Sequence, residues 1–172
     1  LSEVRYWIPS SEDDPSAWRR SGFDDGAWFK GQGSLGYDRA TPPTLLTFID
    51  SSFEDAVLGN ASTVLSRYQI EVTEDQKLLR LRLRYDDGLV FYLNGRLILR
   101  GNAPSRLDYR SRASRPRPTD EVLDVDTLVL RRSDGLRTGK NILAFQMLNS
   151  RSTDRDFLLS IRADLIQQRD HI

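Results

Sequence analysis

The 172-residue chain contains no cysteine, which excludes disulfide bonds, zinc fingers, iron–sulfur clusters and cysteine nucleophiles. It has one histidine, His171, next to the last residue, so catalysis by a histidine base is not expected. No apolar run approaches the roughly 18 residues that span a membrane, and no charged-then-apolar leader opens the chain. Because the chain begins directly at Leu1, we expect a domain excised from a larger protein.

Lysine is also scarce, since the 25 basic residues comprise 22 arginines and 3 lysines, balanced by 25 acidic residues. The charge is unevenly spread: residues 1–60 carry a net charge of −5, residues 61–117 of +6, and residues 118–172 of −1. The length and the 38% hydrophobic content are typical of a single globular domain that buries a core without a disulfide or metal. A neutral total and the lack of a nucleic-acid-binding motif argue against nucleic acid as a partner.

Strand patterns dominate, and no long amphipathic helix is present. Residues 79–85 alternate strictly between apolar side chains and Arg80, Arg82 and Arg84, the period of a half-buried strand. Further strands are predicted at residues 64–72, 89–93, 96–100, 142–148 and 157–166. Short strands without helices between them predict an all-β fold, an antiparallel sandwich or barrel, with one or two short helices at 24–29 and 52–58.

Turn residues place the connections. Asn94-Gly95 between two apolar runs predicts a type I′ hairpin that pairs Leu93 with Arg96 and Tyr92 with Leu97. The tripeptide at residues 86–88, Asp-Asp-Gly, is interpreted as another hairpin turn. Residues 31–48 and 101–121 are predicted as loops. The second loop holds five arginines and is longer than most connections in a compact domain.

Several motifs together resemble a known family. The segments YDDGLVFYLNGRLILRGN, LRTGKNILAFQMLN and STDRDFLLSIRADL, with FDDGAW and GSLGYD upstream, resemble the galactose-binding-like jelly-roll domain of secreted bacterial multidomain proteins. In that group the domain occurs beside lamin-tail-like or spore-coat-protein-H-like kinase modules. A more distant resemblance is to the sugar-binding domain of family-two glycoside hydrolases. The resemblance covers about residues 6–166. It implies a jelly-roll β-sandwich in a single domain spanning residues 1–172, located outside the cell or at its surface.

Carbohydrate-binding modules hold sugar rings on aromatic faces and bind the hydroxyl groups with polar and charged side chains. On this basis the predicted carbohydrate site comprises Tyr37, Asn102, Tyr109, Arg110 and Arg112. Trp7, Trp18 and Trp28 either pack in the core or stack on a ligand. The ligand expected is a polysaccharide or glycan, and an anionic one is among the options.

A group of aspartates is a candidate for a metal site. If the loops meet, Asp86, Asp87, Asp154 and Asp156 offer oxygen ligands for a structural Ca²⁺, helped by Asn149. The resemblance also implies such a calcium ion, although none is required. Turn chemistry and surface ion pairs explain the same residues. A glycosidase pair would need carboxyl groups about 5–9.5 Å apart in a cleft, and no enzyme activity is predicted.

The arginines leave several interpretations open. Arg80, Arg82 and Arg84, with those of the long loop, form a solvated face paired with the acidic first third, a surface for an anionic glycan, or a nucleic-acid site, the first being favoured. We therefore predict a noncatalytic carbohydrate-binding or adhesion module. The alternative is a structural spacer that packs against neighbouring domains of the same protein and binds no free ligand.

Overall fold

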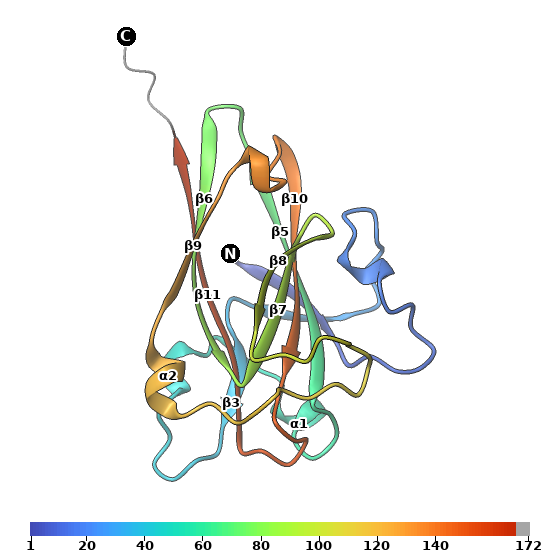
Figure 1. Ribbon diagram of the computed structural model, residues 1–172, viewed down its shortest axis with the longest axis vertical. Coiled ribbons are helices and arrows are strands. Elements are labelled where there is room, and N and C mark those ends of the chain that lie inside the picture. The colour runs from blue at the N-terminus through green and yellow to red at the C-terminus, as the bar shows by residue number, and fades with distance from the viewer. Residues whose placement is uncertain (168–172) are drawn as a thin grey trace.

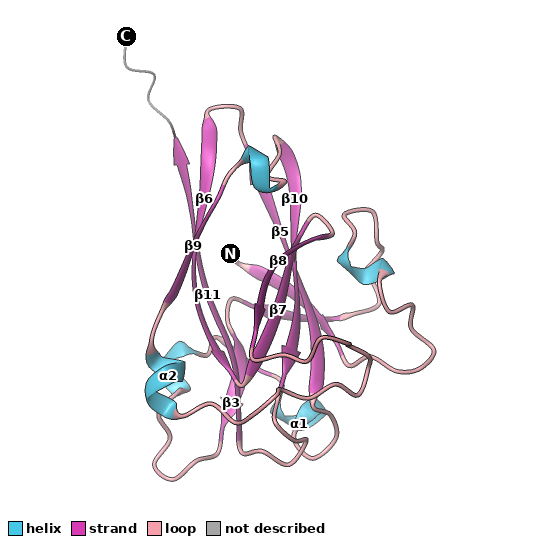
Figure 2. Cartoon of the chain, in the orientation of Figure 1, coloured by secondary structure: helices cyan, strands magenta, loops and turns pink. Residues whose placement is uncertain are grey.

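Two β-sheets lie face to face in the computed structural model (Figure 1; Figure 2), which describes residues 1–167, and their strand pairs are antiparallel apart from one short parallel pair in the second sheet. The predicted all-β sandwich is confirmed, with two short α-helices, α1 (Glu54–Val57) and α2 (Thr119–Leu123). Among residues 1–167 no helix has the length and apolar character needed to cross a membrane. His171 lies outside the described residues.

The first sheet has six strands in the order β2-β1-β5-β10-β7-β8. Their bounds are β1 Glu3–Trp7, β2 Phe29–Gln32, β5 Thr63–Val72, β7 Gly88–Leu93, β8 Arg96–Gly101 and β10 Gly139–Leu148. The second sheet has five strands in the order β4-β3-β11-β6-β9. Their bounds are β3 Leu35–Asp38, β4 Ser51–Ser52, β6 Gln76–Asp86, β9 Asp126–Leu130 and β11 Asp156–Gln167. All six strands predicted from the sequence are present.

Inward-facing side chains of the two sheets form one main core. Leu79, Leu81 and Leu83 of β6 are fully buried, as the alternation in residues 79–85 predicts. From the first sheet, the rings of Phe91 and Phe145 stack with their centroids 4.6 Å apart and join the same cluster. The sandwich is therefore held by apolar packing between the sheets.

The Asn94-Gly95 hairpin forms in the predicted register, and its two turn residues have positive φ angles of 51° and 87°. Farther from the turn, a bulge between Phe91 and Tyr92 shifts the pairing by one residue. Leu99 therefore lies opposite Phe91 and packs against the main core. Strict alternation from the turn would have placed Leu99 on the other face.

The predicted hairpin turn at residues 86–88 is instead a crossing between the two sheets. Asp86 is the last residue of β6 in the second sheet, and Gly88 is the first residue of β7 in the first sheet. The chain crosses inside the end of the sandwich, so Asp86 and Asp87 are only 3% and 2% exposed. The interpretation of these aspartates as surface turn residues is wrong.

The prediction of a loop over residues 31–48 is also wrong. This stretch contains β3, which pairs with β11 and is buried along its whole length, and the 3₁₀ helix η2 (Leu46–Phe48). The helix predicted near residues 52–58 is confirmed as α1, whereas residues 24–29 form turns and the start of β2. Helix α2 lies at the end of the long loop, where the sequence predicted none.

Substitution of Gly36 in β3 tests how closely β3 packs against β11. A Cβ atom at this position would lie 2.4 Å from the carbonyl oxygen of Phe157, whereas a Cβ atom at Gly22 meets nothing within 4 Å. We expect Gly36→Ala to lower the free energy of unfolding by about 1–3 kcal/mol, and Gly22→Ala to change it by less than about 0.5 kcal/mol. Urea denaturation of both variants measures this difference. Equal stability of the two variants would contradict the strand packing described here.

Candidate functional site

A second layer covers the outer face of the six-stranded sheet. Residues 8–28, blue in Figure 1, pass along this side of the molecule and bring Trp18 and Trp28 into a second apolar cluster. The other buried members of this cluster are Leu65, Val90, Tyr92, Ile142 and Ala144. Trp18 and Trp28 are buried, so for these two rings the core-packing alternative is confirmed. Trp7 is partly buried, and its ring stacks on Trp28 with the centroids 6.3 Å apart.

Arg67 of β5 fixes this segment to the sheet. Its guanidinium group donates hydrogen bonds to the carbonyl oxygens of Trp18, Arg20 (2.9 Å) and Phe23 (3.3 Å). It also forms an ion pair with Asp25, at 2.7 Å between Nε and Oδ2. Arg67 is only 3% exposed. Its charge is therefore compensated by backbone dipoles and one carboxylate, not by water.

The long loop after β8 forms the second cover of the same face. The hydroxyl group of Thr63 in β5 donates to the carbonyl oxygen of Ser111, at 2.6 Å. The side-chain amide of Gln146 in β10 donates to the carbonyl oxygen of Asp108, at 3.2 Å. Strands β5 and β10 thus hold the middle of the loop by polar contacts.

Asp87 and Asn102 hold the base of this loop. The two carboxylate oxygens of Asp87 accept hydrogen bonds from the backbone N–H groups of Arg117 (2.7 Å) and Ser150 (2.9 Å). The side-chain amide of Asn102 donates to the carbonyl oxygens of Asp87 (3.0 Å) and Arg115 (2.7 Å). Two buried or half-buried polar side chains therefore determine where the loop leaves and returns to the sandwich.

Between the two covers lies a pocket with a volume of about 270 Å³. Residues 9–19 form one wall, residues 107–109 form the other, and side chains of β5 and β10 contribute to the base. The lining residues are Pro9, Ser10, Ser11, Asp13, Asp14, Pro15, Trp18, Arg19, Leu65, Leu107, Asp108, Tyr109 and Gln146. Apolar walls with a few convergent polar groups are typical of small-molecule sites.

Two polar side chains of the pocket, Gln146 and Arg19, each have an atom that makes no hydrogen bond within residues 1–167: Oε1 of Gln146 and Nε of Arg19. Gln146 is buried and donates to Asp108, but its Oε1 atom accepts no hydrogen bond from residues 1–167. Arg19 lies over the ring of Tyr92, 4.4 Å from the centroid, and donates to the carbonyl oxygen of Pro15. The pocket therefore offers an amide acceptor beside its aromatic and aliphatic walls.

The predicted carbohydrate residues have different positions. Tyr109 lines the pocket, and the guanidinium carbon of Arg110 lies 5.0 Å from the centre of its ring. Arg112 is exposed and does not line the pocket, while Asn102 supports the loop base. Tyr37 is 2% exposed and packs edge-on against Phe53 and Phe157, so its ring has no face available to a sugar.

The sequence reasoning missed several lining residues. Asp13, Asp14 and Gln146 belong to the pocket only because residues 9–19 and β10 meet on this face. The acidic run at residues 12–14 and a glutamine in an otherwise apolar strand were the visible signals, and neither indicates which segment it faces.

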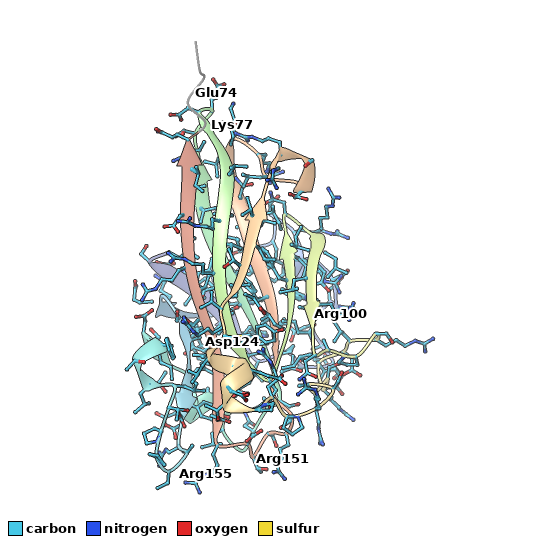
Figure 3. All side chains as sticks on the ribbon, turned by 60° about the vertical axis from the view of Figure 1, so that its left-hand side comes forward. Glu74, Lys77, Arg100, Asp124, Arg151 and Arg155 are labelled. Carbon is cyan, nitrogen blue, oxygen red and sulfur yellow. The ribbon has the colours of Figure 1, made fainter. Side chains whose placement is uncertain are left out.

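The aspartates predicted as calcium ligands converge at one end of the sandwich. Figure 3 shows Arg151 and Arg155, which flank this cluster, at the end opposite Glu74 and Lys77. The carboxyl groups of Asp87 and Asp156 lie close enough to that of Asp86 to raise its pKa. The hydroxyl group of Ser150 donates to Asp154 at 2.6 Å. The expectation that these loops meet is therefore correct.

The donor set does not fit calcium, which takes six to eight oxygen ligands. Both oxygens of Asp87 accept backbone N–H groups, and Asp154 accepts Ser150 and the N–H group of Arg155. The amide oxygen of Asn149 accepts the N–H group of Ser150. Within residues 1–167 no three acidic or histidine side chains are arranged to hold a metal ion. The predicted calcium site is not supported by this geometry.

Burial and like charge instead raise the pKa values of two of these carboxyl groups. Burial, the hydrogen bond to Asp87 and the charge of Asp156 hold the pKa of Asp86 far above its ordinary value. Burial and the charge of Asp154 raise the pKa of Asp156 to about 6. A protonated Asp86 can donate a hydrogen bond to the Asp156 carboxylate, which reduces the repulsion between the two groups.

The arginines of β6 have partners other than the predicted ones. Arg80 and Arg82 both pair with Asp164 of β11, at 3.0 and 3.1 Å. Arg84 donates to the carbonyl oxygen of Leu123 and lies over the ring of Phe48. The expected pairing of this face with the acidic first third of the chain is wrong, because β11 and α2 supply the acceptors.

Comparison with known proteins shows similarity at the level of the fold. No family model and no curated protein matches the chain. An exo-β-D-glucosaminidase, CsxA, is 13% identical with a TM-score of 0.54, over 95% of this chain and 20% of the enzyme. The exo-chitosanase CsxA of Amycolatopsis orientalis is 13% identical with a TM-score of 0.52, over 92% and 20%. A glycosyl hydrolase family 2 member from Bacteroides cellulosilyticus DSM 14838 is 14% identical with a TM-score of 0.48, over 93% and 20%.

At these identities the similarity shows the fold alone. The chain spans about a fifth of the length of these enzymes. The match to the two CsxA structures agrees with the predicted β-sandwich fold. The resemblance to domains beside lamin-tail-like or kinase modules finds no support in these structures.

Arg67 generates a prediction about the N-terminal cover. We expect Arg67→Met to lower the free energy of unfolding by about 3 kcal/mol, because Asp25 and three carbonyl groups lose their donor. Trypsin should also cleave after Arg19 and Arg20 faster in this variant, since the segment is released from the sheet. Arg82→Met, which removes an exposed ion pair, is the control and should change stability by less than about 1 kcal/mol. Unchanged cleavage in Arg67→Met would show that Arg67 does not anchor the segment.

Asp86 generates a prediction about pH. A carboxyl group whose pKa is raised by folding contributes stability below its unfolded pKa of about 3.9 and loses it as the pH rises toward the folded value. Asp86→Asn keeps a neutral hydrogen-bond donor, so we expect it to exceed the wild type in stability by roughly 1–3 kcal/mol at pH 8 and to match it near pH 4.

Urea denaturation at pH 4, 6 and 8 measures this difference, and Asp164→Asn provides a control of opposite sign. Hydrogen bonds from Arg80 lower the pKa of Asp164, so its contribution is present at neutral pH and lost on acidification. A parallel pH dependence of Asp86→Asn and the wild type would be inconsistent with a protonated, buried Asp86.

Proposed function

We propose that this chain is a noncatalytic carbohydrate-binding domain and that the pocket between residues 9–19 and 107–109 is its sugar site. The observation that carries the proposal is the combination of Tyr109 and Leu107 on one wall with the unpaired amide oxygen of Gln146. Sugars have apolar ring faces and peripheral hydroxyl groups, and they need both kinds of contact. The volume of about 270 Å³ lies just below the range of about 300–1,000 Å³ that is usual for ligand pockets, which suits a single sugar ring.

The comparisons support this proposal at a coarser level. The proteins that share the fold include sugar-processing enzymes, and the chain matches only a fifth of each. A domain of this kind would act by holding a larger protein on its polysaccharide, outside the cell or at its surface. Such single sites bind weakly, and tethering to other domains supplies avidity.

A second candidate function rests on an apolar patch on the other sheet. Three exposed apolar side chains form it: Leu46 of η2, Leu123 of α2 and Val125 just after α2. The partly buried Phe48 lies close by, under the guanidinium group of Arg84. Exposed apolar side chains that lie together on one surface favour packing against a neighbouring domain. This observation supports the spacer alternative, in which the chain binds no free ligand.

Tyr109 tests the sugar site. Affinity electrophoresis through gels containing single neutral and charged polysaccharides should show retardation of the wild type. We expect Tyr109→Ala to weaken that retardation about tenfold, because the stacking face is lost, and Tyr109→Phe to retain it. Arg112→Ala is the matched control from the same loop and should leave retardation unchanged. Equal retardation of Tyr109→Ala and the wild type would exclude this pocket, and no retardation in any gel would favour the spacer.

A further inference from the structure

The charge of the pocket is strongly biased toward one sign. Three carboxylates, Asp13, Asp14 and Asp108, line it, against the single guanidinium group of Arg19. Two of the carboxylates belong to the N-terminal wall and the third to the opposite wall. A ligand between these walls is therefore flanked by negative charge on both sides.

In each of these carboxylates one oxygen is held by the protein and the other is not. Oδ2 of Asp13 accepts the N–H group of Ser10 at 2.7 Å and the indole N–H group of Trp7 at 3.2 Å. Oδ1 of Asp108 accepts the N–H group of Arg110 at 2.8 Å. The second oxygens, Oδ1 of Asp13 and Oδ2 of Asp108, accept no hydrogen bond from residues 1–167.

Asp14 follows the same arrangement. Its Oδ1 atom accepts the backbone N–H groups of Ser16 and Ala17, at 2.8 and 3.0 Å, and its Oδ2 atom accepts none from the described residues. The hydrogen bonds from Ser16 and Ala17 lower the pKa of Asp14. This carboxylate therefore stays charged under mildly acidic conditions, and the local turn holds it in place.

The neighbouring arginines do not cancel this charge, and Arg20, whose charge helps to lower the pKa of Asp14, does not line the pocket. The Nε atom of Arg19 is buried and has no hydrogen-bond partner among residues 1–167, and its guanidinium carbon lies over the ring of Tyr92. Arg110 lies over the ring of Tyr109 and does not line the pocket. An anionic sugar would therefore meet more carboxylates than guanidinium groups.

From this arrangement we infer that the pocket selects a sugar with a positively charged amino group, such as a glucosamine unit. The inference rests on the proposed carbohydrate function and names its ligand class. The ammonium group would lie among the free oxygens of Asp13, Asp14 and Asp108 and donate charge-assisted hydrogen bonds to them, which are stronger than hydrogen bonds between neutral groups. The ring would lie against Tyr109, with Gln146 accepting from a hydroxyl group.

The experiment compares three tetrasaccharides with the same β-1,4-linked backbone that differ at carbon 2. The glucosamine tetramer carries an ammonium group, the N-acetylglucosamine tetramer a neutral amide, and cellotetraose a hydroxyl group. We expect isothermal titration calorimetry at pH 5.5 and low salt to give at least tenfold tighter binding of the glucosamine tetramer than of the other two. Added sodium chloride should reduce the difference, because it screens the charges.

Variants separate the pocket from general attraction between charges. Asp13→Asn, Asp14→Asn and Asp108→Asn keep an oxygen acceptor for the local turns, and each should reduce the preference severalfold. The triple variant should bind the three tetramers equally. Asp124→Asn removes the same charge next to α2, on the side of the molecule away from residues 8–28 (Figure 1), and should keep the preference.

The outcomes distinguish this inference from the proposed function. Equal binding of all three tetramers, with loss in Tyr109→Ala, would overturn the selection of an amino sugar and leave the carbohydrate site in place. A preference that Asp124→Asn reduces as much as Asp14→Asn would also overturn it, since the attraction would then be nonspecific. If none of these tetramers and no polysaccharide binds, the proposed function fails, and the inference fails with it.

Discussion

A buried guanidinium group sets the geometry on which the candidate site depends. Arg67 lies on the outer face of the six-stranded sheet, at a buried position where an apolar residue is usual. It donates hydrogen bonds to Asp25 and to carbonyl groups within residues 18–23. Local turns satisfy part of the backbone of residues 8–28, and Arg67 supplies further donors to three of its carbonyl groups. The planar fork of arginine reaches several acceptors at once, which the single ammonium group of lysine does not. The N-terminal wall of the pocket follows from this one side chain.

The opposite wall depends on a second buried charge, at the point where the chain crosses between sheets. Asp87 accepts backbone N–H groups from the long loop and from the segment after β10, and its own N–H group donates to Leu148 at 3.0 Å. The apolar core gives the sandwich its stability, but apolar packing is nondirectional and does not choose a path for an irregular loop. Directional bonds to Arg67 and Asp87 choose the two paths, and the pocket is the space between them.

The sequence predicts what depends on local pattern. Period-two alternation located the six main strands, and the Asn-Gly dipeptide fixed the hairpin register, because both signals arise within a few residues. Prediction from local pattern failed at Asp86-Asp87, because residue types that usually form exposed turns here occupy a buried crossing between the sheets. Tyr37 was misplaced for a similar reason, since a Gly- and Pro-rich stretch concealed β3. Arg67 alternates in β5 as Arg82 does in β6, yet one is buried beneath a covering segment and the other is exposed.

In the candidate site, too, the sequence predicted what a local pattern indicates and missed what depends on contacts between distant segments. Tyr109 was identified because an aromatic residue in a long loop can be recognised from that segment of the sequence alone. Asp13 and Gln146 become neighbours only through contacts between distant parts of the chain, and no local pattern records those contacts. The calcium prediction brought together the correct aspartates but assumed that their oxygens were free, whereas backbone N–H groups occupy both oxygens of Asp87, and burial favours the protonated form of Asp86.

The two acidic groups therefore differ in the property that decides function. At the end of the sandwich the carboxyl groups of Asp86, Asp87 and Asp154 are satisfied by the protein, by each other or by backbone donors, and they stabilise the junction of loops. In the pocket, backbone N–H groups hold one oxygen of Asp14 and of Asp108, and within residues 1–167 the second oxygen of each accepts no hydrogen bond. A carboxylate that is fixed at one oxygen and free at the other loses little conformational entropy when it binds a ligand. This preorganisation, rather than the number of acidic residues, is the reason why we propose the pocket, and not the end of the sandwich, as the binding site.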